Sequence, residues 1–368
     1  MKHRWLKNKA MPMLTLGLVV AHWGAQAQVQ VQDDVVQDWR KANETVGQFP
    51  RGHADVLRWE KSQPTTQAAT PDAVPEFALP STSDAIRAAW KVHRELASPL
   101  ARLGRENVER IAAGAWGEVD TRLQQRIDGA DEVLKVAADT RKAWIRAVAA
   151  KQALKSVEDS VTAAEAAAEL GRRMVSVGNW SRYQQAQVAL GESSARMELK
   201  RARLTASQAE RALLKTMGLD SVHSRVALPD RLPDTATPMS DTELRTRLAA
   251  IQGNLPLAQS RKTGNNAMQA YAAYAASLDV YHGYRNDVLK QRELIGEETQ
   301  LRYNGMLESV WGVLADVKAR SQTVVAAIDA QRDALIAETD LQWVLQGGQP
   351  DAFVALGGGE QATAAAGH

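Results

Sequence analysis

The side chains most able to bind metals or take part in catalysis are scattered along this sequence. No two of its seven histidines have the spacing of a metal-binding pair: they are His3, His22, His53, His93, His223, His282 and His368. The absence of cysteine excludes disulfides, thiolate metal sites and cysteine nucleophiles. No P-loop, dinucleotide-binding or Gly-x-Ser-x-Gly pattern is present. We therefore expect no catalytic residues, no cofactor and no metal site, and we expect that the chain is not an enzyme.

Three groups of acidic and aromatic residues could have other roles. Glu297 and Glu298 would point about 100° apart on a helix, so we expect them on a solvated face rather than as an acid–base pair. Four tyrosines share one side of a helix and are expected to pack at a helix interface rather than to stack on a ligand: Tyr271, Tyr274, Tyr281 and Tyr284. Trp180 and Trp311 follow two turn-forming glycines, where an aromatic ring can either be exposed for a partner or cover the hairpin end.

Composition indicates a helical, exported protein. Of 368 residues, 45% are hydrophobic, and the 24 glycines and 12 prolines cluster between long runs rich in alanine, glutamate, arginine and glutamine. Residues 1–27 carry four basic and no acidic residues, then an apolar stretch and Ala25-Gln26-Ala27, which is typical of a cleaved signal peptide rather than of a membrane anchor. Without this segment 41 basic residues face 43 acidic ones, about −2 net, so we expect no nucleic-acid binding.

Proline-rich breaks divide the rest of the chain. We expect an N-terminal segment and linker over 28–82, a first helical hairpin over 83–219, a linker over 220–240, a second hairpin over 241–349 and a flexible tail over 350–368. Ser81–Asp84 is expected to begin a long helical region that runs, with a weak break near Gly114 and Gly117, to about Val177.

Both hairpins show the apolar spacing of coiled helices. Steps of three and four residues separate the positions Ala147, Ala150, Leu154, Val157, Val161, Ala164 and Ala168. The second hairpin continues this register at Leu307, Val310, Leu314, Val317, Val324, Ile328 and Leu335, with Ser321 and Gln331 as polar interruptions. The stretch from Asp131 to Val177 would form a rod of about 70 Å. The predicted fold class is therefore all-α, with two direct repeats of a long coiled-coil hairpin.

The two predicted hairpin turns occupy equivalent places in the repeats. Placing Trp144 on Tyr271 also places Gly178 on Gly305 without a gap. Gly178 suits a left-handed position after a helix, and Ser181 with Gln184 forms a capping-box pattern. Asn304-Gly305 is expected to supply the positive φ of the second turn.

These turns and the repeat resemble the TolC-like outer-membrane efflux proteins. The resemblance spans roughly 83–348 and rests on Val177–Ser181 (VGNWS) and Arg302–Leu307 (RYNGML). The segments Ala138–Trp144 (ADTRKAW) and Leu301–Leu307 (LRYNGML) also resemble a branch of this family that is associated with copper and other heavy-metal resistance. The second turn departs from the Gly-x-x-Ser/Thr pattern, because Ser309 follows Gly305 by four residues. The chain also departs from the family in that we expect no membrane-inserted β-strands, since the matching places, Leu100–Gly129 and Gly253–Met268, hold charged helical sequence and a short link.

The resemblance implies a homotrimer whose hairpins form a periplasmic tunnel of α-helical-barrel type. It implies a periplasmic adaptor protein and an inner-membrane pump as partners, and a location in the periplasm and cell outer membrane of a Gram-negative bacterium. The implied partner-binding residues at the hairpin tips are Gly178, Asn179, Trp180, Ser181, Tyr303, Asn304 and Gly305. Two functions stay open: a passive tunnel component of a tripartite efflux system, with metal ions as one class of solute, and a periplasmic helical scaffold without a pore or transport activity.

Overall fold

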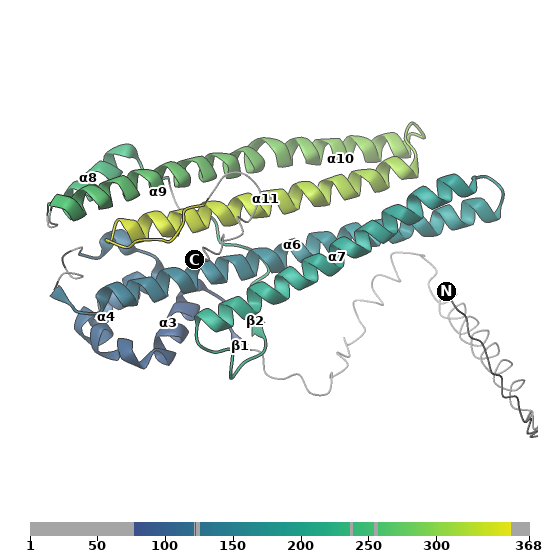
Figure 1. Cartoon of the computed structure of the whole chain (residues 1–368). Helices are drawn as coiled ribbons and strands as arrows, with labels where there is room; N and C mark the ends of the chain where they lie inside the picture. The colour runs from purple at the N-terminus through teal and green to yellow at the C-terminus, as the bar shows by residue number, and fades with distance from the viewer. Residues whose placement is uncertain (1–76, 121, 123–125, 236–237, 254–256, 355–368) are drawn as a thin grey trace, which may run out of the picture. The chain divides into compact units, whose positions relative to one another are not determined.

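The computed structural model describes residues 77–120, 122, 126–235, 238–253 and 257–354. The expected signal peptide, the linker up to residue 76 and the tail beyond residue 354 lie outside these residues. The described part is dominated by long helices, which confirms the all-α class and the pair of hairpins (Figure 1).

Two antiparallel helices form the first hairpin. Helix α6 spans Ala130–Ser176 and α7 spans Arg182–Thr216, and the two pack along their length. The 47 residues of α6 have the length expected from the sequence. In the half of α6 nearest the turn to α7, three residues of the predicted seam are buried: Val157, Val161 and Ala168. The seam therefore joins helices as its spacing predicts.

The second hairpin pairs a segmented helix with a continuous one. Helix α9, Leu257–Gly283, continues through the π-helical turn η3, Tyr284–Val288, into α10, Leu289–Asn304. The return helix α11 spans Val310–Val344, and the short α8, Asp241–Gln252, packs on α9. The helix α11 begins three residues after Leu307, which is 75% exposed, so the prediction that Leu307 starts the seam is wrong.

The segment before α6 is more divided than the helical region with one weak break, near Gly114 and Gly117, that was predicted there. It folds into α3, Thr82–Val92, the 3-10 turn η1, Arg94–Leu96, α4, Ala97–Ala113, and the turn η2, Trp116–Glu118. Gly104, Gly114 and Gly129 adopt positive φ values of 77°, 84° and 83°, which a continuous helix cannot contain. These glycines let α3 and α4 turn back and pack against the first turns of α6.

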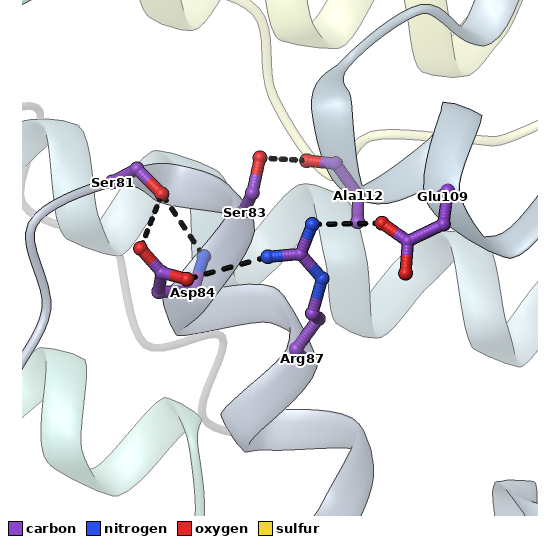
Figure 2. A network of polar contacts seen from close by, with 6 residues as sticks. All are labelled: Ser81, Ser83, Asp84, Arg87, Glu109 and Ala112. Atoms are coloured by element: carbon purple, nitrogen blue, oxygen red, sulfur yellow. Dashed lines mark hydrogen bonds and ion pairs between the residues drawn. The ribbon is translucent and has the colours of Figure 1, made fainter.

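Polar contacts fix the start of α3 against α4 (Figure 2). Ser81 caps α3 as predicted, because its Oγ accepts a hydrogen bond from the Asp84 amide at 3.2 Å. Arg87 bridges the helices by donating to Asp84 at 3.3 Å and to Glu109 at 2.7 Å. Ser83 Oγ donates to the carbonyl of Ala112 at 3.0 Å. The predicted helix start is thereby confirmed and tied to its neighbour.

The main core surrounds the tip-distal ends of α6 and α11. Buried tryptophans there have satisfied indole N–H groups: Trp144 donates to the Leu79 carbonyl at 3.1 Å and Trp90 to the Val133 carbonyl at 3.2 Å. A second cluster joins α8, α9 and α11 and buries Tyr274 and Tyr281. Tyr271 and Tyr284 pack against it, which confirms that the tyrosine stripe lies at a helix interface.

A short pair of β-strands joins the segment before α3 to the segment after α7. Strand β1, Phe77–Ala78, pairs in parallel with β2, Val226–Ala227. Sequence patterns gave no signal for these two-residue strands, because pairing over so short a length depends on tertiary contacts. None of the helices within the described residues is long and apolar enough to cross a membrane.

Candidate partner-binding site at the hairpin tips

The first tip has the predicted turn chemistry. Helix α6 is followed by Gly178 at φ 78°, and the Asn179 amide donates back to the Met174 carbonyl at 2.9 Å. The Ser181 side chain accepts from the Gln184 amide while the Gln184 side chain accepts from the Ser181 amide, at 3.2 and 3.0 Å. The left-handed glycine and the capping box are both confirmed.

The second tip uses the same turn shifted by one residue. Gly305 has φ −80°, whereas Met306 has φ 59°, so the prediction that Gly305 supplies the positive φ is wrong. The Leu307 amide donates back to the Arg302 carbonyl at 2.8 Å, as the Asn179 amide does in the first tip. Gly305 still lies within the helical hydrogen-bonding pattern, because its amide donates to Leu301. Met306 is therefore the structural counterpart of Gly178.

This shift explains the altered serine spacing. Ser309 follows Met306 by three residues, just as Ser181 follows Gly178, and its Oγ accepts from the Gly312 amide at 3.2 Å to cap α11. The position three residues into α11 is glycine, so this cap has no reciprocal side-chain bond like that of Gln184. The Ser309 departure from the family pattern is thus a one-residue register change and leaves the helix cap in place.

An aromatic contact joins the two tips. The rings of Trp180 and Trp311 stack with centroids 4.2 Å apart and planes 29° from parallel. Trp180 also lies over Gly171 of α6, where a β-carbon would stand 3.4 Å from the ring. Of the two possibilities for these tryptophans, the structure shows the one in which the rings cover the hairpin ends. The contact brings residues 131 positions apart in the sequence into one site.

Apolar side chains are exposed around this aromatic pair. Met306 is 93% and Leu307 75% exposed, and Val177 and Tyr303 are also exposed. We call the exposed residues of the two turns the tip surface: Val177, Asn179, Ser181, Tyr303, Asn304, Met306 and Leu307. Sequence reasoning omitted Met306 and Leu307, although two large apolar residues directly after a turn glycine were an available signal. Contiguous exposed apolar groups are typical of surfaces that bind proteins.

Ion pairs hold the hairpins together away from the tips. Lys142 of α6 contacts Asp340 of α11 at 3.1 Å, and its ammonium lies 5.1 Å from the centre of the Trp343 ring. Burial raises the pKa of the Asp340 carboxyl, while the Lys142 charge opposes that shift. Burial also raises the pKa of Glu338, with Arg141 opposing it. These groups lie at the interface of α6 and α11 and link the two repeats.

The acidic and histidine residues form no metal-binding group of three in the described part of the chain. Glu297 and Glu298 are exposed on α10, which confirms the solvated face. Two small cavities, of about 230 and 360 Å³, share Arg247 and Gln342 between α8 and the end of α11. They lie at the opposite end of α11 from the tip surface.

Comparison with known proteins gave similarities in structure alone. No protein-family model and no curated protein matches the chain. The chain is similar to the CmeC outer membrane channel of Campylobacter jejuni, with 13% identity and a TM-score of 0.48, covering 65% of this chain and 67% of that one. It is similar to a membrane protein from Pseudomonas aeruginosa, with 12% identity and a TM-score of 0.46 over 64% and 72% of the two chains. A structure of CusC gives 12% identity and 0.46 over 73% and 91%. These are low similarities, and by themselves they assign no function to the chain.

Proposed function

We propose that this chain is a TolC-like, passive tunnel component of a tripartite efflux system. In this proposal the signal peptide exports it to the periplasm, where it assembles as a homotrimer associated with the outer membrane of a Gram-negative bacterium. A periplasmic adaptor protein binds the tip surface and connects it to an inner-membrane pump. The chain itself does no covalent chemistry.

The joined hairpin tips are the observation that best supports this proposal. The two long hairpins have their turns at the same end, and Trp180 beside the first turn stacks on Trp311 near the second. Large apolar residues of the turns, Met306 and Leu307 above all, are exposed. A rigid double tip with exposed apolar groups can bind a protein partner without enclosing a small ligand.

The test is an efflux assay in a Gram-negative strain that lacks its own outer-membrane efflux channel. The strain would carry the genes of a periplasmic adaptor and an inner-membrane pump from the organism that encodes this chain, and its tolerance of copper ions and of organic pump substrates would be measured. We expect the full chain to restore tolerance. Met306→Glu with Leu307→Glu should abolish it, because two charges would oppose an apolar contact, whereas Gln208→Glu on exposed α7 should not.

The same assay separates the tunnel from the scaffold. If the adaptor co-purifies with the chain but tolerance to every substrate stays at the level of the empty strain, the chain is a scaffold without transport activity. Tolerance to organic substrates but not to copper would leave the tunnel proposal in place and reject metal ions as its solute.

A further inference from the structure

The end of the molecule opposite the tip surface holds two adjoining cavities between α8 and the end of α11. The smaller, of about 230 Å³, also borders the turn η2 and the two residues after it, and the larger, of about 360 Å³, borders α9. Arg247 of α8 and Gln342 of α11 line both, so the cavities meet at these two side chains. A ligand bound here would therefore contact both repeats.

One buried amide oxygen at the smaller cavity lacks a hydrogen-bond partner. Gln346 is 5% exposed, and its Nε2 donates to the carbonyls of Trp116 and Val119 at 2.6 and 3.4 Å. The Oε1 of the same amide accepts no hydrogen bond from the described part of the chain. A buried acceptor without a donor is destabilising, so a bound molecule that carries an N–H group would stabilise this amide.

One buried carboxylate at the larger cavity lacks a cation. Glu338 is 7% exposed, and it accepts a hydrogen bond from Gln342 Nε2 at 3.2 Å. Among the described residues, no basic nitrogen lies within 4.0 Å of this carboxylate. Arg141 acts on it from farther away and opposes the rise in pKa that burial causes. Because a buried carboxylate must either find a cation or bind a proton, this cavity favours a cationic group with N–H donors.

The smaller cavity has an acidic residue of its own. Asp120 is exposed, and its Oδ1 accepts a hydrogen bond from the Arg122 amide at 2.9 Å. Like Glu338, it has no ion-pair partner within the described ranges. With Glu243, three acidic residues and one basic residue, Arg247, line the two cavities. The lining therefore carries two net negative charges when all four groups are ionised.

The basic residue of this lining is already paired and held in place. Arg247 Nη2 donates to Glu243 at 2.5 Å. The guanidinium also packs so closely against Gly117 that a β-carbon there would overlap it. A bound anion would compete with Glu243 for the guanidinium and would be repelled by Glu338 and Asp120. The charges thus favour a cation over an anion.

Helix geometry gives the distance between the two ends of the site. Glu338, Gln342 and Gln346 follow one another at intervals of four residues, so they lie on one side of α11 and its C-terminal turn. The eight residues from Glu338 to Gln346 correspond to about 12 Å along the axis. Apolar residues also line the cavities, among them Ile251, Leu341 and Leu345. The site therefore has an acceptor group at each end and apolar side chains along its length.

We propose that the two cavities together bind a linear aliphatic diamine as its dication. One ammonium group donates to the Glu338 carboxylate in the larger cavity. The other lies in the smaller cavity beside Asp120 and supplies the donor that Gln346 Oε1 lacks. The methylene chain covers Leu341 and Leu345, and the two positive charges balance the net charge of the lining. This site is separate from the tip surface and requires neither an adaptor nor a pump.

Isothermal titration calorimetry of the purified full-length chain tests the larger cavity. The probe is 1,8-diaminooctane, whose extended length is of the order of the distance between the two ends, and we expect one diamine per chain. Glu338→Gln keeps an acceptor for Gln342 and should weaken binding at least about tenfold, because it removes the buried partner of one ammonium group. Glu297→Gln removes the same charge from the exposed face of α10 and should bind like the native chain.

A second comparison tests the smaller cavity. The probe 8-aminooctan-1-ol has the same length but one ammonium group, which Glu338 binds. Asp120→Asn should weaken diamine binding about two- to fivefold, the range of an exposed ion pair, and leave binding of the amino alcohol unchanged. Because Asp120 is exposed, this variant tests the site even if Glu338→Gln does not fold, which thermal melts of each variant would reveal.

Three results would overturn the proposal. The first is no binding of the diamine by the native chain. The second is equal weakening by the folded Glu338→Gln and Glu297→Gln variants, which would mean that the diamine is held by general electrostatic attraction. The third is an Asp120→Asn variant that changes the binding of both probes alike or of neither, which would mean that the ligand does not reach the smaller cavity. The titration uses no adaptor, pump or efflux, so its failure is distinguishable from failure of the efflux assay.

Discussion

At the scale of single residues, the two tip turns share one geometry but use different amino acids. Gly178 holds the positive φ of the first turn, and Met306, not Gly305, holds that of the second. A left-handed residue with a β-carbon is destabilised by roughly 1–2 kcal/mol, so only the first turn depends on its glycine.

The same substitution should therefore have opposite consequences in the two turns. Gly178→Ala should lower the melting temperature, by an amount corresponding to about 1 kcal/mol. Gly305→Ala should leave it unchanged or raise it, because φ is already −80° and a β-carbon there meets its nearest neighbour at an ordinary 3.5 Å. Differential scanning calorimetry of both variants makes the comparison, and equal destabilisation would refute the register shift.

The tryptophan stack joins the tips through a pair that can be measured. Trp180→Ala, Trp311→Ala and the double variant should give a coupling energy of about 0.5–1.5 kcal/mol, the range for aromatic pairs. Urea unfolding of the native chain, the two single variants and the double variant, followed by fluorescence, completes this double-mutant cycle. Additive single effects would mean that the rings do not contribute to each other's stability.

At the scale of helices, the capping box should matter more for its helix than the simpler cap of α11 does. Ser181→Ala removes the Oγ that accepts from the Gln184 amide at 3.2 Å and donates to the Gln184 side chain at 3.1 Å, at a cost of about 1 kcal/mol. Ser309→Ala removes the acceptor of the Gly312 amide and only a longer, 3.5 Å hydrogen bond from Ser309 Oγ to Glu308. Hydrogen exchange should accelerate more over the first turn of α7 than over that of α11, and the reverse order would contradict the assignment.

The interface of α6 and α11 should make stability depend on pH through Glu338. Burial raises the pKa of this carboxyl, so the folded protein holds the proton more tightly than the unfolded chain. The stabilisation from this site is present below the ordinary glutamate pKa of about 4.3 and is lost as pH rises through the raised pKa. Glu338→Gln keeps a polar group beside Gln342 and removes the titration.

The melting temperature of Glu338→Gln relative to that of the native chain should therefore increase as pH is raised from about 4 to 7. Thermal melts followed by circular dichroism at several pH values measure this difference. A difference that is constant with pH would show that Glu338 does not titrate differently on folding.

At the scale of the whole molecule, regular helical periodicity and local turn chemistry were readable from the sequence. The long α6, the Gly178 turn and the Ser181 capping box each depend on residues within a few positions of one another. The folding back of α3 and α4 was missed, because a glycine in a helical pattern shows that a break is possible but not which surface the next helix packs on.

Other features depend on contacts between distant segments. The Trp180–Trp311 stack and the β1–β2 bridge join residues more than a hundred positions apart, and local patterns carry no information on such pairs. The Met306 turn was misplaced because the sequence alignment of the repeats favoured glycine on glycine, while the backbone hydrogen bonds place methionine there. The domain boundaries and the partner-binding role of the tips stay predictions.

Export gives a further whole-chain prediction. We expect cleavage after Ala27, so intact-mass spectrometry of protein from the periplasm or envelope should find Gln28 as the first residue. Detection of the Met1 terminus in that material would reject the cleavage.

Binding of the tip surface to a periplasmic adaptor is the central claim, and a quantitative pull-down against the adaptor used in the efflux assay tests it most directly. The variants are Met306→Glu with Leu307→Glu at the tip and Gln208→Glu on α7, each with a melting curve. The account predicts that the tip variant loses adaptor binding at an unchanged melting temperature, while Gln208→Glu binds like the native chain. Native-like binding by the folded tip variant would contradict it and place the partner on another surface.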